Sequence, residues 1–171
     1  MGSARYSTAA MDLLQRARDL YAAGDIHEAL QAAQVAAERA PRDPSAWRLL
    51  AQVSRHAGMP GASDDAFRRA AVLSRRHRVP VRLTEERFHA LVREVTAGLS
   101  PDARRRLEGV SVRIESLPSA DAIRRGVKPD AGAHRVRRPV DVLTLYQANL
   151  ENRAHGEPEL RGLVERTLSR G

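Results

Sequence analysis

Residues 140–171 read VDVLTLYQANLENRAHGEPELRGLVERTLSRG, and this stretch decides how the second half of the chain folds. Its first part, 140–146, is rich in β-branched and aliphatic residues and predicts a strand. Its last part, 157–168, has the periodicity of an amphipathic helix. The apolar positions of that helix are Leu160, Leu163, Val164 and Leu168. We therefore interpret the second half as a fold built around a strand that leads into a helix.

The order of residues in this stretch resembles the approach to the active site in the minimal zincin-like metallopeptidases of bacteria. In that family a strand reading roughly ITLYQ is followed by an Asn, an acidic residue and a helix reading ELxxxVxxTL. The matching positions here are Leu143-Thr144-Leu145-Tyr146-Gln147, Asn149, Glu151, Glu159-Leu160, Val164 and Thr167-Leu168. The resemblance covers residues 83–171 and implies a metallopeptidase-like scaffold for them.

The zinc-binding motif of that family does not follow. HExxH places two His on one helix face to hold zinc, with the Glu as general base. Here Ser169, Arg170 and Gly171 stand where the motif is expected, and Arg cannot ligate zinc. No two of the six His are three or four positions apart, although His134 and His155 could meet in space. We assign no catalytic, cofactor-binding or metal-binding residue and expect no enzymatic activity; zinc is expected only if the missing motif were present.

The residues before this stretch predict the rest of an α+β domain. Helices are expected from Thr84, from Ser100 and over 119–125. Alternation of apolar and polar residues over 110–115 predicts a strand, and 126–138 predicts a basic loop. The two strands are expected to pair as a two-stranded sheet. The whole chain is thus predicted to be α+β and mostly α.

The first half, residues 8–78, contains two segments, 10–43 and 44–77, that align at a spacing of 34 residues. This is the period of the tetratricopeptide repeat (TPR), which the sequence resembles. The positions that carry the resemblance are Ala17 and Ala51, Gly24 and Gly58, Ala36 and Ala70, Pro41, Trp47, Leu50 and Phe67. Ser63 and Arg75 depart from the family, where a small Ala and a closing Pro are usual. The resemblance implies two helical hairpins.

Local signals support these hairpins. Gly24 and Gly58 are expected to end helices in the left-handed conformation, and Asp25 and Asp43 are expected to cap the helices that follow. Two repeats are fewer than a solenoid usually needs, so another element must cover the last apolar face. The helix from Thr84 is the candidate for that cover.

A pair of such hairpins predicts a groove for a protein or peptide partner. We expect the groove to be lined by Tyr21, Arg48, Gln52 and Arg55. Pro80 stops the preceding helix, and we place the boundary between the two halves there. The apolar face of the last helix is expected to be left uncovered, which predicts a frayed C-terminus or a self-association surface.

Composition narrows the functional classes. The chain has no Cys, which excludes disulfides and thiolate chemistry and suits a reducing cytoplasm. Its net charge is +8, and all but one of its 29 basic residues are Arg, yet these are scattered and aromatics are only 4%. That pattern disfavours nucleic-acid binding. No apolar stretch is long enough to span a membrane, so we expect a cytoplasmic protein.

Three functions follow from these observations. We expect a non-catalytic interaction or adaptor protein with TPR-like repeats and a degenerate zincin-like domain. The first alternative is an incomplete copy of an active zinc metallopeptidase. The second is a basic protein associated with nucleic acid, whose affinity would fall steeply with salt.

The spacing of the His residues predicts that this chain does not retain zinc. After incubation with excess zinc and desalting, atomic absorption should find only a small fraction of an equivalent per chain. Stoichiometric zinc held with sub-micromolar affinity would contradict this interpretation.

Overall fold

A computed structural model describes the backbone of residues 2–170 and the side chains of residue 9 and residues 11–170. The chain divides into two compact units. The first comprises Met1–Val79 with Ala120–Pro129, and the second comprises Pro80–Ser119 with Asp130–Gly171. Residue 171, the last of the expected second domain, lies outside the described residues. Each unit is described by itself below.

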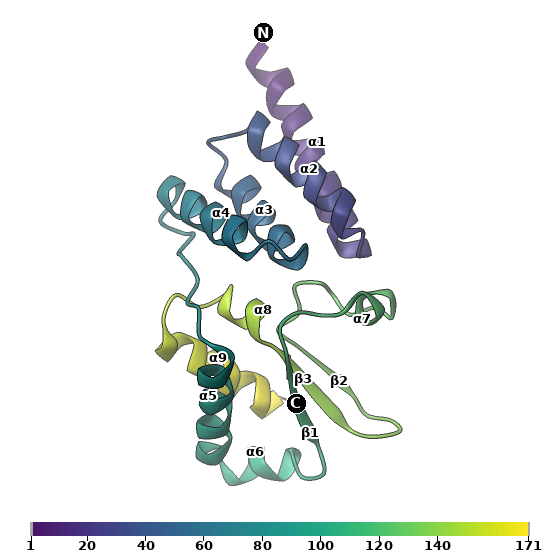
Figure 1. Ribbon diagram of the computed structural model, residues 1–171, viewed down its shortest axis with the longest axis vertical. Coiled ribbons are helices and arrows are strands. Elements are labelled where there is room, and N and C mark those ends of the chain that lie inside the picture. Colours follow the sequence, from purple (N-terminus) through teal and green to yellow (C-terminus); the bar gives the residue numbers. More distant parts are fainter. Residues whose placement is uncertain (1, 171) are drawn as a thin grey trace. The chain divides into compact units, whose positions relative to one another are not determined.

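The first unit contains four consecutive helices (Figure 1). They are α1 (Gly2–Ala23), α2 (Ile26–Arg39), α3 (Pro44–His56) and α4 (Pro60–Leu73). Each helix packs on the next, giving the two helical hairpins predicted from the repeat spacing. The buried face of α2 consists of Ala29, Ala32, Ala33, Ala36 and Ala37. Because these side chains are single methyl groups, neighbouring helix backbones approach closely and few aromatic residues are needed.

The turns of both hairpins follow the predicted chemistry, with one exception. Gly24 and Gly58 have φ of 87° and 76°, the left-handed conformation that ends a helix. The Asp43 carboxylate accepts a hydrogen bond from the Ser45 amide at 2.8 Å, as expected of an N-cap. Asp25 stands at the N-cap of α2 but makes no capping hydrogen bond with its side chain, so that prediction was wrong.

A short segment from the second half of the sequence belongs to the first unit. It contains α7 (Ala120–Arg124) and buries Ile123 and Val127. A Cβ atom placed on Gly24 would lie 2.7 Å from a methyl carbon of Ile123. The turn between α1 and α2 therefore packs directly against α7. The prediction placed this segment in the second domain, 83–171, whereas the structure groups it with the first unit.

The second unit is built on a three-stranded sheet in the order β1-β3-β2. The strands are β1 (Ser111–Glu115), β2 (Ala133–Val136) and β3 (Val142–Tyr146). β1 pairs with β3 in parallel, which confirms the predicted pairing. The sheet has a third strand, however. This strand, β2, lies inside the segment predicted to be a loop, and it pairs antiparallel with β3. The sequence Ala-His-Arg-Val is too short and too polar to predict a strand by itself.

Helices pack against this sheet to form the core of the second unit. They are α5 (Glu85–Gly98), α6 (Pro101–Arg106), α8 (Gln147–Glu151) and α9 (Glu157–Arg170), and α9 contacts α5, α6 and α8 (Figure 1). Ser100 and Thr84 cap α6 and α5, as expected. The structure is thus α+β and mostly α, as predicted.

Two expectations about apolar faces were wrong. Leu160, Val164 and Leu168 of α9 are fully buried in the core of the second unit, whereas we expected them to be uncovered. The apolar face of α5, which includes Phe88 and Leu91, is buried in the same core. That face was expected to cover the hairpins of the first unit. Both errors have one cause: the apolar faces of α5 and α9 pack in the same core. Sequence spacing alone does not reveal a packing partner so distant along the chain.

A buried carboxylate joins the start of α5 to α8. Glu151 is 3% exposed and accepts hydrogen bonds from the Leu83 amide at 3.1 Å and from the Gln147 side chain at 2.8 Å. Arg82 donates to it at 3.3 Å and to Asn152 at 2.9 Å. Both oxygens of the carboxylate thus accept hydrogen bonds, which a buried charge requires.

The packing of α7 on Gly24 predicts a difference between two glycine substitutions. Gly58→Ala introduces only the left-handed strain, since nothing lies within 4 Å of its new Cβ, and should cost about 1–2 kcal/mol. Gly24→Ala also clashes with Ile123 and should cost about 1–3 kcal/mol more. Urea denaturation followed by the fluorescence of Trp47, the sole tryptophan, measures both.

The double variant Gly24→Ala/Ile123→Ala tests the same contact. Removing the Ile123 side chain should relieve the clash, so the double variant should lose less stability than the two single losses added together. Equal losses for the two glycine variants, or strict additivity in the double variant, would contradict the packing of α7 on this turn.

Candidate functional site

The four residues predicted to line a partner groove are placed in the first unit, but mostly in internal contacts. Tyr21 is buried, and its hydroxyl lies 3.5 Å from Nδ1 of His56. Arg55 pairs with Asp64 at 2.5 Å, and its side chain is only 15% exposed. The Arg48 guanidinium lies over the Phe67 ring, 5.8 Å from its centre, and Gln52 is half-buried. The contacts of Tyr21, Arg48 and Arg55 join α3 to α1 and α4, and the predicted groove stays a prediction.

The first unit has a cavity of about 430 Å³ elsewhere, lined mainly by α3 and α4. Its residues are Gln34, Trp47, Leu50, Ser54, Met59, Ala62, Asp65, Ala66 and Arg69. None of the four predicted groove residues is among them. The missed signal is Met59, a large apolar residue in the turn between two helices, where it is 42% exposed.

Trp47 forms part of the cavity wall and is held in place by contacts within the unit. Its indole Nε1 donates to the Pro41 carbonyl at 2.9 Å, so the polar atom of the ring is satisfied within the unit. The Arg69 guanidinium lies 5.7 Å from the ring centre, within the range of a cation–π contact. Leu50 also lines the cavity and is only partly buried. An apolar floor with a few polar groups at its rim is the usual composition of a ligand or side-chain pocket.

The second unit contains the residues that resemble the metallopeptidases. The strand and helix of the opening stretch are β3 and α9, joined by α8. Ring atom Nδ1 of His155 pairs with Glu159 one helical turn away, and His134 lies on β2. No group of three or more His, Cys, Asp or Glu side chains suited to a metal occurs in the described part of the chain.

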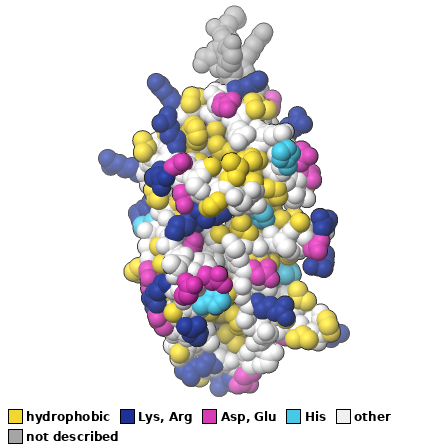
Figure 2. Space-filling model, viewed as in Figure 1, with side chains coloured by type: hydrophobic (Ala, Val, Ile, Leu, Met, Phe, Trp, Pro, Cys, Tyr) yellow, Lys and Arg dark blue, Asp and Glu magenta, His cyan; other side chains and the backbone are white. Residues whose placement is uncertain are grey.

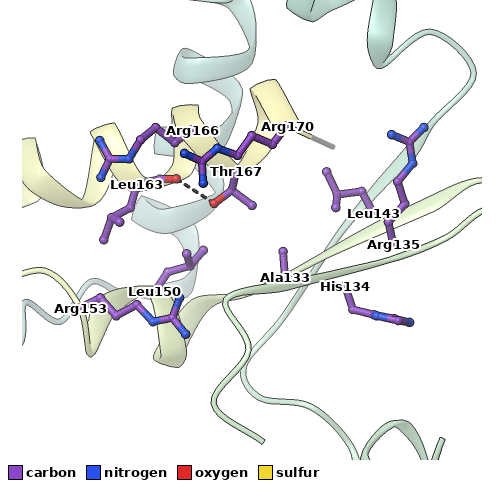
Figure 3. A pocket seen from close by; sticks show the side chains of 10 residues that line it. All are labelled: Ala133, His134, Arg135, Leu143, Leu150, Arg153, Leu163, Arg166, Thr167 and Arg170. Atoms are coloured by element: carbon purple, nitrogen blue, oxygen red, sulfur yellow. Dashed lines mark hydrogen bonds between the residues drawn. The ribbon is translucent and has the colours of Figure 1, made fainter. Parts of the chain in front are cut away.

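A second cavity of about 350 Å³ lies between α9 and the β2–β3 hairpin (Figure 3). It is lined by Ala133, His134, Arg135, Leu143, Leu150, Arg153, Leu163, Arg166, Thr167 and Arg170. In Figure 3, Arg166, Thr167 and Arg170 lie along the helix on one side, with Leu150 and Arg153 facing them across the opening. Four of the ten lining residues are Arg, and none is acidic. Sequence reasoning missed this cavity because its residues come from four successive segments, β2, β3, α8 with the residues after it, and α9, which only the fold brings together.

The hairpin beside this cavity is closed by an ion pair. Nε and Nη2 of Arg135 donate to the two carboxylate oxygens of Asp141, at 2.8 and 2.6 Å. The Arg135 hydrogen bonds hold the pKa of the Asp141 carboxyl below its ordinary value. Arg135 is therefore electrically balanced by its own hairpin.

Several other described ion pairs are local contacts on the surface. Arg68 pairs with Asp65, Arg105 with Asp102 and Arg124 with Asp121, each three residues apart on one helix. In Figure 2, Lys and Arg side chains are scattered over the visible face and interspersed with Asp and Glu. This agrees with the scatter inferred from the sequence. None of the helices in the described part of the chain is both long and apolar enough to cross a lipid bilayer.

Comparisons of the chain with protein-family models, with curated proteins and with solved structures found no match. The likeness to TPR proteins and to zincin-like metallopeptidases therefore stays a prediction from the residues. The class that the geometry describes is an α+β chain whose described residues include an apolar cavity in the first unit and a basic cavity in the second.

The Arg135–Asp141 pair predicts how acid acts on the hairpin. A carboxyl with a lowered pKa in the folded state stabilises that state above its unfolded pKa, near 3.8. This contribution is lost as the pH falls through the lower folded value. Asp141→Asn should therefore be less stable than the parent chain at pH 6, and the difference should shrink below about pH 3.8.

Thermal unfolding followed by circular dichroism across this pH range measures the effect. Asp102→Asn, which removes a carboxylate from an exposed pair within one helix turn, is the matched control. A stability difference between Asp141→Asn and the parent that stays constant down to pH 2 would contradict the role assigned to the pair.

Proposed function

We propose that this protein is a non-catalytic interaction protein whose helical hairpins hold a segment of a protein partner. The observation that carries the proposal is the apolar cavity lined by Trp47, Leu50 and Met59. The second unit supplies a metallopeptidase-like scaffold in this proposal, without a catalytic role. TPR-like repeats and a cytoplasmic location belong to the same proposal.

The cavity favours a peptide with an apolar anchor side chain. Its floor is formed by aliphatic and aromatic groups, so burying an apolar side chain there gains about 25 cal/mol per Å² removed from water. The exposed lining residues Gln34 and Asp65 offer donors and acceptors for a peptide backbone. Anchors of this kind contribute most of the affinity at protein interfaces, and the surrounding contacts exclude water.

Trp47 makes the cavity suitable for recognition because it is fixed before binding. Its hydrogen bond to Pro41 and its contact with Arg69 restrict the ring. A restricted side chain loses little conformational entropy when a partner docks.

Peptide selection tests this proposal. A display library of random peptides is selected on the intact chain and depleted on Leu50→Glu, which places a charge on the cavity floor. The enriched peptides should share an apolar anchor, and calorimetry should show binding weakened by about tenfold or more in Leu50→Glu.

Val72→Glu is the matched control, because Val72 lies on α4 and is 83% exposed outside the cavity. It should bind the selected peptides as the parent does. Failure to enrich any peptide that distinguishes the two variants would overturn the proposed function.

A further inference from the structure

The charges around the basic cavity of the second unit suggest a binding site that is separate from the partner-binding cavity. Of its four Arg residues, Arg135 is balanced by Asp141. Arg153 donates to the Asp130 carbonyl at 2.6 Å, a neutral acceptor that leaves its positive charge in place. Arg166 and Arg170 are exposed and belong to α9. No carboxylate is among the described residues that line the cavity.

Arg166 and Arg170 place two positive charges on one face of α9, because they are four residues apart. Arg170 also stands in the last turn, where a positive charge complements the helix dipole. Like charges at this spacing repel each other, and a bound anion would offset that repulsion.

The floor of the cavity strengthens any such contact. Leu143 and Leu150 are buried beneath it, and Ala133 and Leu163 are half-buried. Apolar walls lower the local dielectric, so a hydrogen bond from a guanidinium to an anion is stronger here than on an open surface. The guanidinium groups themselves remain accessible, because Arg153, Arg166 and Arg170 are all exposed.

The number of charges selects the kind of anion. A carboxylate carries one negative charge and would leave two of the three guanidinium groups uncompensated. A phosphate group carries about −1.5 to −2 at neutral pH and has several acceptor oxygens, which match the planar donors of Arg. The Thr167 hydroxyl also lines the cavity and donates to the Leu163 carbonyl at 2.8 Å, so its oxygen can accept but its proton is used.

We propose that the cavity formed by Arg153, Arg166 and Arg170 binds a small phosphate-containing anion with two phosphate groups or a similar charge. A volume of about 350 Å³ is at the lower end of the range for small-molecule pockets. A confined cavity suits a small anion better than a nucleic-acid strand, which is held by an extended basic track. This site does not depend on the peptide-binding proposal.

Calorimetry with the full chain and pyrophosphate at low ionic strength tests the site. The parent chain should bind one equivalent. Arg153→Gln/Arg166→Gln should weaken binding by about tenfold or more, since each charge-assisted hydrogen bond contributes about 1.5–3 kcal/mol. Arg68→Gln/Arg105→Gln removes the same charge from exposed pairs outside the cavity and should leave the affinity unchanged.

Two further measurements keep the result unambiguous. Circular dichroism checks that the cavity variant is folded. If Arg153→Gln loosens the loop at Asp130, the single variants Arg166→Gln and Arg170→Gln carry the test, because both side chains are exposed on α9. Each should weaken pyrophosphate binding by a smaller factor than the double variant.

Several outcomes would overturn the proposal. These are no binding of pyrophosphate by the parent chain, equal loss in the cavity and control variants, and equally tight binding of citrate. Binding of a single-stranded oligonucleotide without binding of pyrophosphate would also overturn it. The strand would then contact basic residues spread over the surface and not the cavity.

Discussion

The buried carboxylate of Glu151 is the interaction on which the second unit depends. A charge that is 3% exposed must be surrounded by donors. One donor, Gln147, lies on the same helix, and the other two, Arg82 and Leu83, come from the segment before α5, almost seventy residues earlier in the chain. Because Glu151 ends α8, its anchoring fixes the residues beside it. Leu150 reaches the floor of the basic cavity and Arg153 its rim. The geometry of that cavity is therefore set by a polar contact outside it.

The first unit packs its helices through alanine faces, because the chain has few aromatic side chains. Alanine faces on α2 and at Ala46 and Ala51 allow the helices to approach closely, so dispersion contacts replace bulk. The few large residues are then available for other roles. Trp47 and Leu50 are only partly buried, and they line the apolar cavity rather than the centre of the core. Dense alanine packing and a surface cavity are thus two consequences of one composition.

The Arg residues discussed above differ in whether an acidic side chain lies beside them. Arg55, Arg82 and Arg135 are half-buried and paired with Asp64, Glu151 and Asp141, where each holds two segments together. Exposed pairs on single helices contribute little to stability. Arg153, Arg166 and Arg170 differ from both groups, because none of the described residues that line the cavity they share is acidic. An overall net charge of +8 therefore says less about function than the placement of three side chains does.

The sequence by itself determined most of the helices, including many of their ends, and the pairing of β1 with β3, whereas α8 was not predicted. These follow from periodicity, from glycine at left-handed positions and from capping residues such as Asp43 and Thr84, which act within a few residues. It did not reveal that Ala133–Val136 forms a strand, because four residues with a polar alternation need the edge of β3 to become one.

Only the tertiary structure decided where α7 packs, what covers the apolar face of α9, and which residues line the two cavities. Ile123 meets Gly24 across about a hundred residues, and Arg153 reaches Arg166 and Arg170 through the fold rather than along one helix. Local patterns encode the conformation of the backbone, because its hydrogen bonds and steric limits are short in range. Cavities are made by contacts between segments that only the packed core brings together.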